Sequence, residues 1–135
     1  MDKPKILVTE DDADARQRLA AILKRHIECD IIEAADGRQA FELLNKEKFD
    51  LILLDIKMPG ISGIDILKKT KDLCPKTDIL VISAWDSEAI AEEALQDGAI
   101  DYIPKPSTPE VILEDIARIL KKRNKYLPKE SSHKQ

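Results

Sequence analysis

Carboxylate, hydroxyl and ammonium side chains follow four of the short apolar runs in this chain. Glu10 and Asp11 follow the first run after Thr9, and Asp55 comes directly after the third run. Ser83 comes directly after the fourth run, and Lys105 follows the fifth run after Pro104. If the runs are parallel strands of one open sheet, their carboxyl ends meet at one edge, where ligands bind in sheets of this kind. The five side chains are therefore expected to form one site.

The types of these residues indicate metal-assisted phosphoryl chemistry. Clustered carboxylates repel one another, and a hard divalent cation such as Mg2+, which prefers oxygen ligands, allows them to stay ionised together. Lys105 adds a fixed positive charge, and Ser83 adds a hydroxyl that can donate to a phosphoryl oxygen. Asp55 is the candidate nucleophile, because a carboxylate can attack phosphorus and form a labile aspartyl phosphate.

Each of these positions also has a purely structural interpretation. Asp12, beside the acidic pair, is expected to be the N-cap of the helix that follows, as aspartates at strand ends often are. A lysine before a proline, such as Lys105, is commonly an ordinary loop residue. Only the combination of residues at the matching ends of four strands favours a functional site.

The apolar pattern predicts five alternating strands and helices. The short runs are 6–8, 31–32, 51–54, 79–82 and 100–103. Several of them have apolar residues at consecutive positions, which suits strands buried on both faces of a parallel sheet. Apolar residues at helical spacing lie between them; the predicted helices are about 12–26, 38–46, a segment after 63, 87–96 and a segment from about 108. Five such units in about 120 residues are too few for a closed barrel. The prediction is therefore an α/β fold with an open, doubly wound parallel sheet.

Two helix ends carry local signals. Gly98 lies just beyond the fourth predicted helix and suits a C-cap region. Pro109 follows Thr108 and suits the first position of the last helix, where its missing N–H is not needed.

Composition and charge exclude several classes of protein. The 135 residues are 43% hydrophobic and 36% charged, which fits one globular domain. No apolar run approaches the roughly 20 residues of a membrane span, and the start of the chain turns acidic too soon for a signal peptide, so we expect a cytoplasmic protein. A net charge of -4 gives no support for nucleic-acid binding. Cys29 and Cys74 lack the spacing of a zinc site or a disulfide framework.

Four motifs share their residues and spacing with a known family. They are ILVTEDD at 6–12, LILLDIKMPGISG at 51–63, VISAW at 81–85 and YIPKPST at 102–108. In this combination, the chain resembles the receiver (CheY-like) domains of two-component response regulators over roughly residues 3–124. The resemblance implies a flavodoxin-like (βα)5 fold with five strands in the order 2-1-3-4-5. A receiver domain is therefore expected at 1–124. The end of the chain lacks periodicity and apolar content after Leu127, so a flexible tail or truncated linker is expected at 125–135.

The resemblance assigns a metal site and a phosphoacceptor. Glu10 and Asp11 match the acidic pair that organises Mg2+, with Asp11 as the expected direct ligand. Asp55 matches the phosphoacceptor and a further metal ligand. Lys57 matches the position whose backbone carbonyl binds the metal. Glu10 stands where Asp is commoner, and its longer side chain reaches the metal either directly or through water.

The resemblance also implies a switch. Ser83 matches the hydroxyl position, and Lys105 the lysine that pairs with the phosphoryl group; the Lys105–Pro106 peptide bond is implied to be cis. Tyr102 matches the aromatic switch position on the fifth strand. Phosphate on Asp55 then draws Ser83 inward, Tyr102 turns toward the core, and the face made by the fourth helix, fifth strand and fifth helix changes as the two states shift in population.

The implied function is phosphorelay signalling rather than enzyme catalysis. A sensor histidine kinase or a phosphotransfer protein supplies the phosphoryl group, and the chain assists only its own phosphorylation and dephosphorylation. A downstream effector protein or domain binds the switched face, with a phosphorylation-linked homodimer as an option. No membrane and no direct nucleic-acid partner is expected.

Two other functions fit parts of the pattern. A metal-dependent phosphatase with an aspartate nucleophile needs a second Asp two residues later, and Lys57 stands there instead. A Rossmann-like nucleotide-binding module needs a glycine-rich turn after the first strand, where this chain has TEDDADA. Trp85 flanks the site and is either a residue that tunes phosphate hydrolysis or an ordinary loop aromatic.

Overall fold

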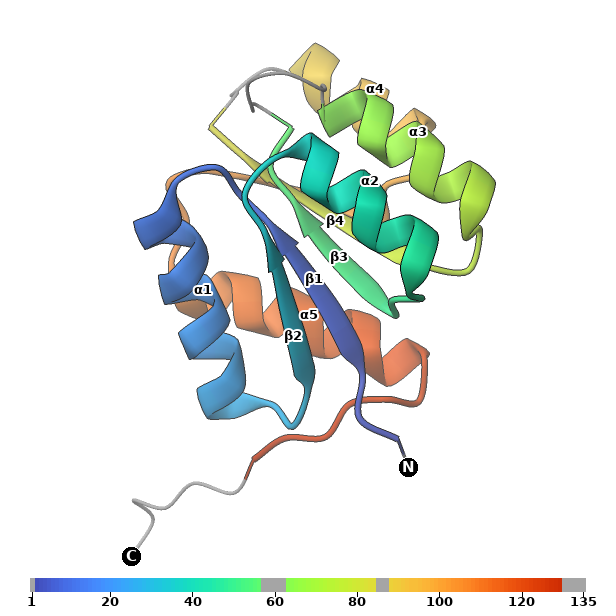
Figure 1. Cartoon of the computed structure of the whole chain (residues 1–135). Helices are drawn as coiled ribbons and strands as arrows, with labels where there is room; N and C mark the ends of the chain where they lie inside the picture. The colour runs from blue at the N-terminus through green and yellow to red at the C-terminus, as the bar shows by residue number, and fades with distance from the viewer. Residues whose placement is uncertain (1, 57–62, 85–87, 130–135) are drawn as a thin grey trace, which may run out of the picture.

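The computed structural model describes residues 2–56, 63–84 and 88–129. The strands are β1 (Lys5–Thr9), β2 (Asp30–Ala34), β3 (Leu51–Leu54), β4 (Asp78–Ser83) and β5 (Asp101–Pro104). The helices are α1 (Ala13–His26), α2 (Gly37–Lys46), α3 (Gly63–Leu73), α4 (Glu88–Gln96) and α5 (Pro109–Lys122). Neighbouring strands are parallel in the order β2-β1-β3-β4-β5, which confirms the predicted open sheet (Figure 1). No helix in the described ranges combines the length and apolar character that crossing a membrane requires.

Neighbouring residues of the inner strands face opposite layers of the core. Leu7 packs in the cluster that includes residues of α2, α3 and α4, whereas Ile6 and Val8 pack in the cluster with α1 and α5. Figure 1 shows the same division, with α1 and α5 on one face of the sheet and the other three helices on the opposite face. The strands therefore need apolar residues at consecutive positions, as the sequence has them.

The predicted helix-end signals are confirmed. Asp12 caps α1, because its side chain accepts from the N–H groups of Asp14 and Ala15. Thr108 caps α5, which begins with Pro109. Gly98 lies beyond α4 with a φ of 113°, in the left-handed region that favours glycine.

The first residue of α3 touches the segment that leaves β3. A Cβ atom on Gly63 would lie 2.2 Å from the Cα of Ile56, a separation that real atoms do not reach. Gly63 also donates its N–H to the Ile56 carbonyl at 3.4 Å. Only glycine allows this approach, which keeps α3 close to the exit of β3, next to Asp55.

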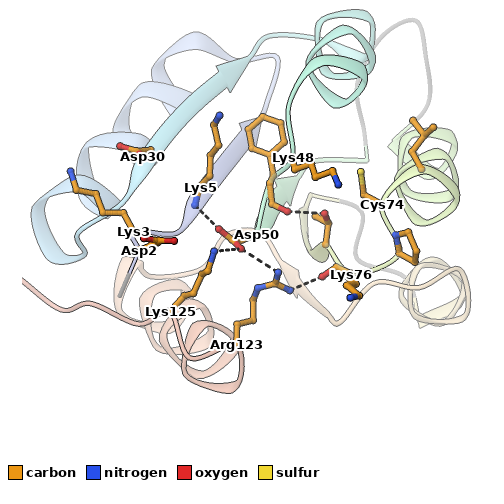
Figure 2. A pocket seen from close by; sticks show the side chains of 14 residues that line it. Asp2, Lys3, Lys5, Asp30, Lys48, Asp50, Cys74, Lys76, Arg123 and Lys125 are labelled. Atoms are coloured by element: carbon orange, nitrogen blue, oxygen red, sulfur yellow. Dashed lines mark hydrogen bonds and ion pairs between the residues drawn. The ribbon is translucent and has the colours of Figure 1, made fainter.

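Asp50 joins the amino ends of the strands to the C-terminal part of the chain (Figure 2). Its carboxylate accepts from the Lys5 N–H at 2.9 Å and pairs with Arg123 at 3.2 Å and Lys125 at 3.0 Å. Arg123 also pairs with Asp78, the first residue of β4, at 3.1 Å. Burial raises the pKa of Asp50, but the hydrogen bonds and cations outweigh burial and hold the pKa below its ordinary value of 3.8.

The described segment after α5 folds back along the end of α1. Within residues 125–129, Tyr126 packs against the core cluster of α1 and α5. Ile27 and Pro128 form an antiparallel bridge, flanked by main-chain hydrogen bonds of 2.7 and 2.9 Å. These contacts attach the segment to the domain as far as Lys129, and residues 130–135 lie outside the described ranges.

Replacing Asp50 by Asn is expected to destabilise the domain at neutral pH. The variant keeps an acceptor for the Lys5 N–H but loses the charge that faces Arg123 and Lys125, so the free energy of unfolding should fall by about 1–3 kcal/mol. Because folding lowers the pKa of Asp50, the stability it contributes is present above its ordinary pKa of 3.8. That contribution is lost as the pH falls through the lower pKa of the folded state.

Urea unfolding of the parent and of Asp50→Asn across pH 2.5–7 measures this difference. The gap between the two proteins should close toward the acid end. Asp72→Asn is the matched control, since it removes the same charge at an exposed position of α3. A gap that stays constant with pH would show that the charge of Asp50 is not what stabilises the fold.

Candidate functional site

The strand ends bring the predicted site residues to one edge of the sheet. Glu10, Asp55 and Lys105 each come one residue after a strand, β1, β3 and β5 respectively, and Ser83 is the last residue of β4. Main-chain hydrogen bonds continue past the strands: the Asp55 N–H donates to the Thr9 carbonyl at 3.1 Å, and the Lys105 N–H to the Ser83 carbonyl at 2.8 Å. The hydrogen bonding of the sheet therefore fixes the backbone positions from which these side chains extend.

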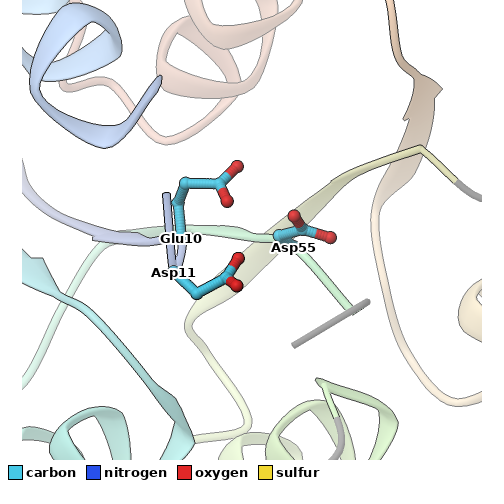
Figure 3. Close-up of side chains that lie close together, drawn as sticks. All are labelled: Glu10, Asp11 and Asp55. Carbon is cyan, nitrogen blue, oxygen red and sulfur yellow. The ribbon is translucent and has the colours of Figure 1, made fainter. Parts of the chain in front are cut away.

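Three carboxylates converge at this edge (Figure 3). Glu10, Asp11 and Asp55 each place one carboxylate oxygen within 4.8 Å of the others. Glu10 and Asp55 are each only 7% exposed, whereas Asp11 is exposed. The three carboxylates therefore form a set of oxygen ligands in which two side chains are buried and one is exposed to solvent.

Lys105 supplies positive charge to this cluster. Its Nζ contacts Glu10 Oε1 and lies 3.2 Å from Asp55 Oδ2. The second oxygen of Glu10 accepts from the Asp12 N–H at 3.1 Å. Burial lowers the pKa of Lys105, but the Glu10 and Asp55 carboxylates outweigh burial and raise it. Lys105 is thus held firmly in its charged form.

The cluster keeps an excess of negative charge. Among the described residues, three carboxylates face one ammonium, and the pKa of Asp11 is raised, first by partial burial and then by the neighbouring Glu10 carboxylate. An oxygen-only donor set with surplus negative charge fits a hard divalent cation such as Mg2+. The side chains that could hold it are Asp11, Asp55 and Glu10. Lys57, implied as a carbonyl ligand, and the flanking Trp85 lie outside the described residues.

The two residues assigned to the switch lie on neighbouring strands. Ser83 is completely buried at the end of β4. Tyr102, on β5, pairs with Val81 in the sheet register and packs, half-buried, against the core layer under α2, α3 and α4. The Lys105–Pro106 peptide bond is cis, as the resemblance implies. The structure thus brings Ser83 to the acidic edge and leaves Tyr102 further back on the sheet.

Sequence reasoning missed Arg16, which contacts the acidic loop. Its Nη1 donates to the Glu10 carbonyl at 2.9 Å, and its Nε donates to Glu33 at 3.0 Å. One signal was available: Arg16 is a cation in the first turn of a predicted helix, where the helix dipole disfavours positive charge. Such a residue needs a partner outside its own helix.

A cavity of about 620 Å³ lies at the opposite edge of the sheet, and its lining is drawn in Figure 2. Lys5, Asp50 and Arg123 belong to this lining, and the carboxylate among them already pairs with two cations. Of the described residues that line this cavity, none belongs to the acidic cluster. The surplus charge lies at the carboxyl edge, which is therefore the candidate functional site.

Asp11→Asn is expected to separate metal binding from folding. The neutral amide removes the charge whose partial burial and closeness to Glu10 raise the pKa of Asp11, so the cation-free domain should become slightly more stable, by up to about 1 kcal/mol. The same change removes an anionic ligand, so Mg2+ affinity should fall at least about tenfold. Thermal unfolding with a chelator and calorimetric titration with Mg2+ measure the two effects.

Asp72→Asn again provides the control, because it should change neither quantity. A fall in cation-free stability for Asp11→Asn, with unchanged Mg2+ affinity, would contradict the assignment of Asp11 to a metal site.

Comparisons with known proteins agree on one family. The model of the response regulator receiver domain matches residues 6–117. The chain is 33% identical over 117 residues to the chemotaxis protein CheY of Thermotoga maritima, covering 87% of this chain and 98% of that protein. It is 35% identical over 124 residues to the response regulator protein PilR of Pseudomonas aeruginosa, covering 92% of this chain but only 28% of PilR.

Solved structures give the same result. A CheY-like response regulator receiver domain protein from Methanospirillum hungatei superposes with a TM-score of 0.85 at 29% identity, covering 92% of this chain and 98% of that one. The chain spans less than a third of the length of several relatives, among them PilR and a cyclic di-GMP phosphodiesterase of Thermotoga maritima. What those longer proteins do as a whole is a property of their full length.

Proposed function

Because the chain belongs to the response regulator receiver domain family, we propose that it accepts a phosphoryl group on Asp55 from a histidine kinase or a phosphotransfer protein. The observation that carries the proposal is the placement of Asp55. Its buried carboxylate stands at the carboxyl end of β3, within 4.8 Å of two other carboxylates and 3.2 Å from Lys105. This is where an α/β sheet binds ligands.

The transfer makes one bond and breaks one. An oxygen of Asp55 forms a bond to phosphorus, the bond from phosphorus to the donor breaks, and its electron pair leaves with the donor. Asp11, Asp55 and Glu10, with the Lys57 backbone carbonyl that the family resemblance implies, would hold Mg2+, which would supply charge stabilisation for the phosphoryl oxygens. Lys105 is already charged and close to Asp55, so it can pair with a phosphoryl oxygen without first gaining a proton.

The proposed output is a change on the face formed by α4, β5 and α5. Ser83 turns its hydroxyl toward the phosphoryl group, and Tyr102, which already packs half-buried against the core, turns further inward, so that this face favours a downstream effector protein or domain. The site and the face are connected through β4 and β5, which pair directly in the sheet. The size of the shift depends on how differently phosphate contacts the two states. A phosphorylation-linked homodimer is the alternative output.

We place this receiver in the cytoplasm, with no membrane partner and no direct nucleic-acid contact. It assists its own phosphorylation and dephosphorylation and is not an enzyme acting on other substrates. The receiver domain was expected at 1–124, and the contacts of residues 125–129 with the end of α1 support an extent as far as Lys129.

Incubation with acetyl phosphate tests the proposal directly. The parent should gain one phosphoryl group in intact-mass measurement when Mg2+ is present, and none with a chelator. Asp55→Asn should gain none, because an amide nitrogen and oxygen do not replace the carboxylate nucleophile. Lys105→Met should fold but label at least about tenfold more slowly, since a charge that meets the transferred group is lost.

Asp72→Asn is the control and should label like the parent. Labelling of Asp55→Asn at the parent rate would refute Asp55 as the acceptor. Steady release of phosphate from simple phosphate esters would point instead to a hydrolytic enzyme.

A further inference from the structure

The guanidinium of Arg16 connects three parts of the chain beside the acidic edge. Arg16 lies in the first turn of α1, and only 14% of its side chain is exposed. It donates to the Glu10 carbonyl at 2.9 Å and to Glu33 on β2 at 3.0 Å. A planar guanidinium has donors in fixed directions, so it can bind both oxygens at once.

The strand β2 and Arg16 together hold both backbone polar groups of Glu10. The Glu10 N–H donates to the Ala34 carbonyl at 3.1 Å, and the Glu10 carbonyl accepts from Arg16, which Glu33 holds in turn. Because a peptide unit is planar, the direction of this carbonyl also sets the N–H and Cα of Asp11. Arg16 therefore influences the direction in which the Asp11 side chain leaves the backbone.

A positive charge at the position of Arg16 does not by itself stabilise α1. The amino end of a helix carries partial positive charge, which disfavours a cation in the first turn. Asp14 in the same turn and the basic residues of the last turn follow the normal preference. The contacts of Arg16 with Glu10 and Glu33 account for a cation near the amino end of α1, which the helix dipole does not favour.

We propose that Arg16, supported by Glu33, is a positioning residue for the divalent cation site. It holds the peptide between Glu10 and Asp11 so that the Asp11 carboxylate stays opposite Asp55. Arg16 itself touches neither the cation nor the phosphoryl group. The inference rests on the metal site of the proposed function, and it adds a residue that determines how well that site is formed.

Arg16→Lys is the central variant, because it keeps the positive charge and loses the planar fork. We expect the Kd for Mg2+ to rise about tenfold in calorimetric titration at fixed ionic strength, as for other residues that orient metal ligands. The maximal rate of labelling by acetyl phosphate at saturating Mg2+ should stay within about twofold of the parent rate, because no reacting group is lost. Only the Mg2+ concentration at half-maximal rate should increase.

Two variants of Glu33 separate geometry from charge. Glu33→Gln keeps an oxygen acceptor for Arg16 and should leave the Kd close to the parent value. Glu33→Ala removes that acceptor and should raise the Kd by an intermediate factor. Arg18→Lys, at an exposed position of the same helix, is the matched control and should have no effect. Glu33 is partly exposed, so both of its variants are expected to fold.

An unchanged Kd in both Arg16→Lys and Glu33→Ala would overturn the positioning role. So would an equal loss of affinity in Glu33→Gln and Glu33→Ala, since charge alone would then explain the effect. A slower maximal rate without any change in the half-saturating Mg2+ concentration would also contradict it. A parent that binds Mg2+ but takes no label refutes phosphoryl acceptance, while calorimetry on the same variants still decides the role of Arg16.

Discussion

At the carboxyl edge of the sheet, Lys105 lies against two buried carboxylates, Glu10 and Asp55, and its ammonium group offsets part of their charge. A carboxylate removed from water is strongly disfavoured unless cations or hydrogen bonds compensate it. The compensating lysine follows β5, whereas the carboxylates follow β1 and β3. The acidic edge therefore exists only when the sheet is assembled in its full order. Among the described side chains of this edge, one ammonium for three carboxylates leaves negative charge that a divalent cation can balance.

The carboxylates at the two edges of the sheet differ in how well neighbouring cations and hydrogen bonds compensate their charge. At the amino edge, Asp50 has a backbone donor and two cations, and its pKa is lowered. At the carboxyl edge, partial burial and the neighbouring Glu10 carboxylate raise the pKa of Asp11. The amino edge thus stabilises the fold and attaches the C-terminal segment to it. The carboxyl edge retains an imbalance that suits ligand binding, as functional sites commonly do.

Much of the fold and most of the candidate site could be predicted from local pattern. Consecutive apolar residues predicted strands buried on both faces, and Asp12 and Thr108 predicted the starts of two helices, because capping is a contact between near neighbours. The meeting of Glu10, Asp55 and Lys105 also followed from their place after the strands, since a parallel sheet aligns those ends. The attachment of residues 125–129 could not be predicted, because that stretch has no periodicity and its partners are far away in the chain.

The sequence by itself determined the alternation of strands and helices and the residue types available at the carboxyl edge. These are local properties of spacing, capping and burial, and they do not depend on which segments become neighbours. Only the tertiary structure decided that Glu10 pairs with Lys105 and that Arg16 donates to the Glu10 carbonyl while it pairs with Glu33. It also decided that Asp50 pairs with Arg123 and Lys125. Those contacts depend on strand order and register. These contacts cannot be deduced from a single sequence, because many different partners would satisfy the same charge or hydrogen-bonding group.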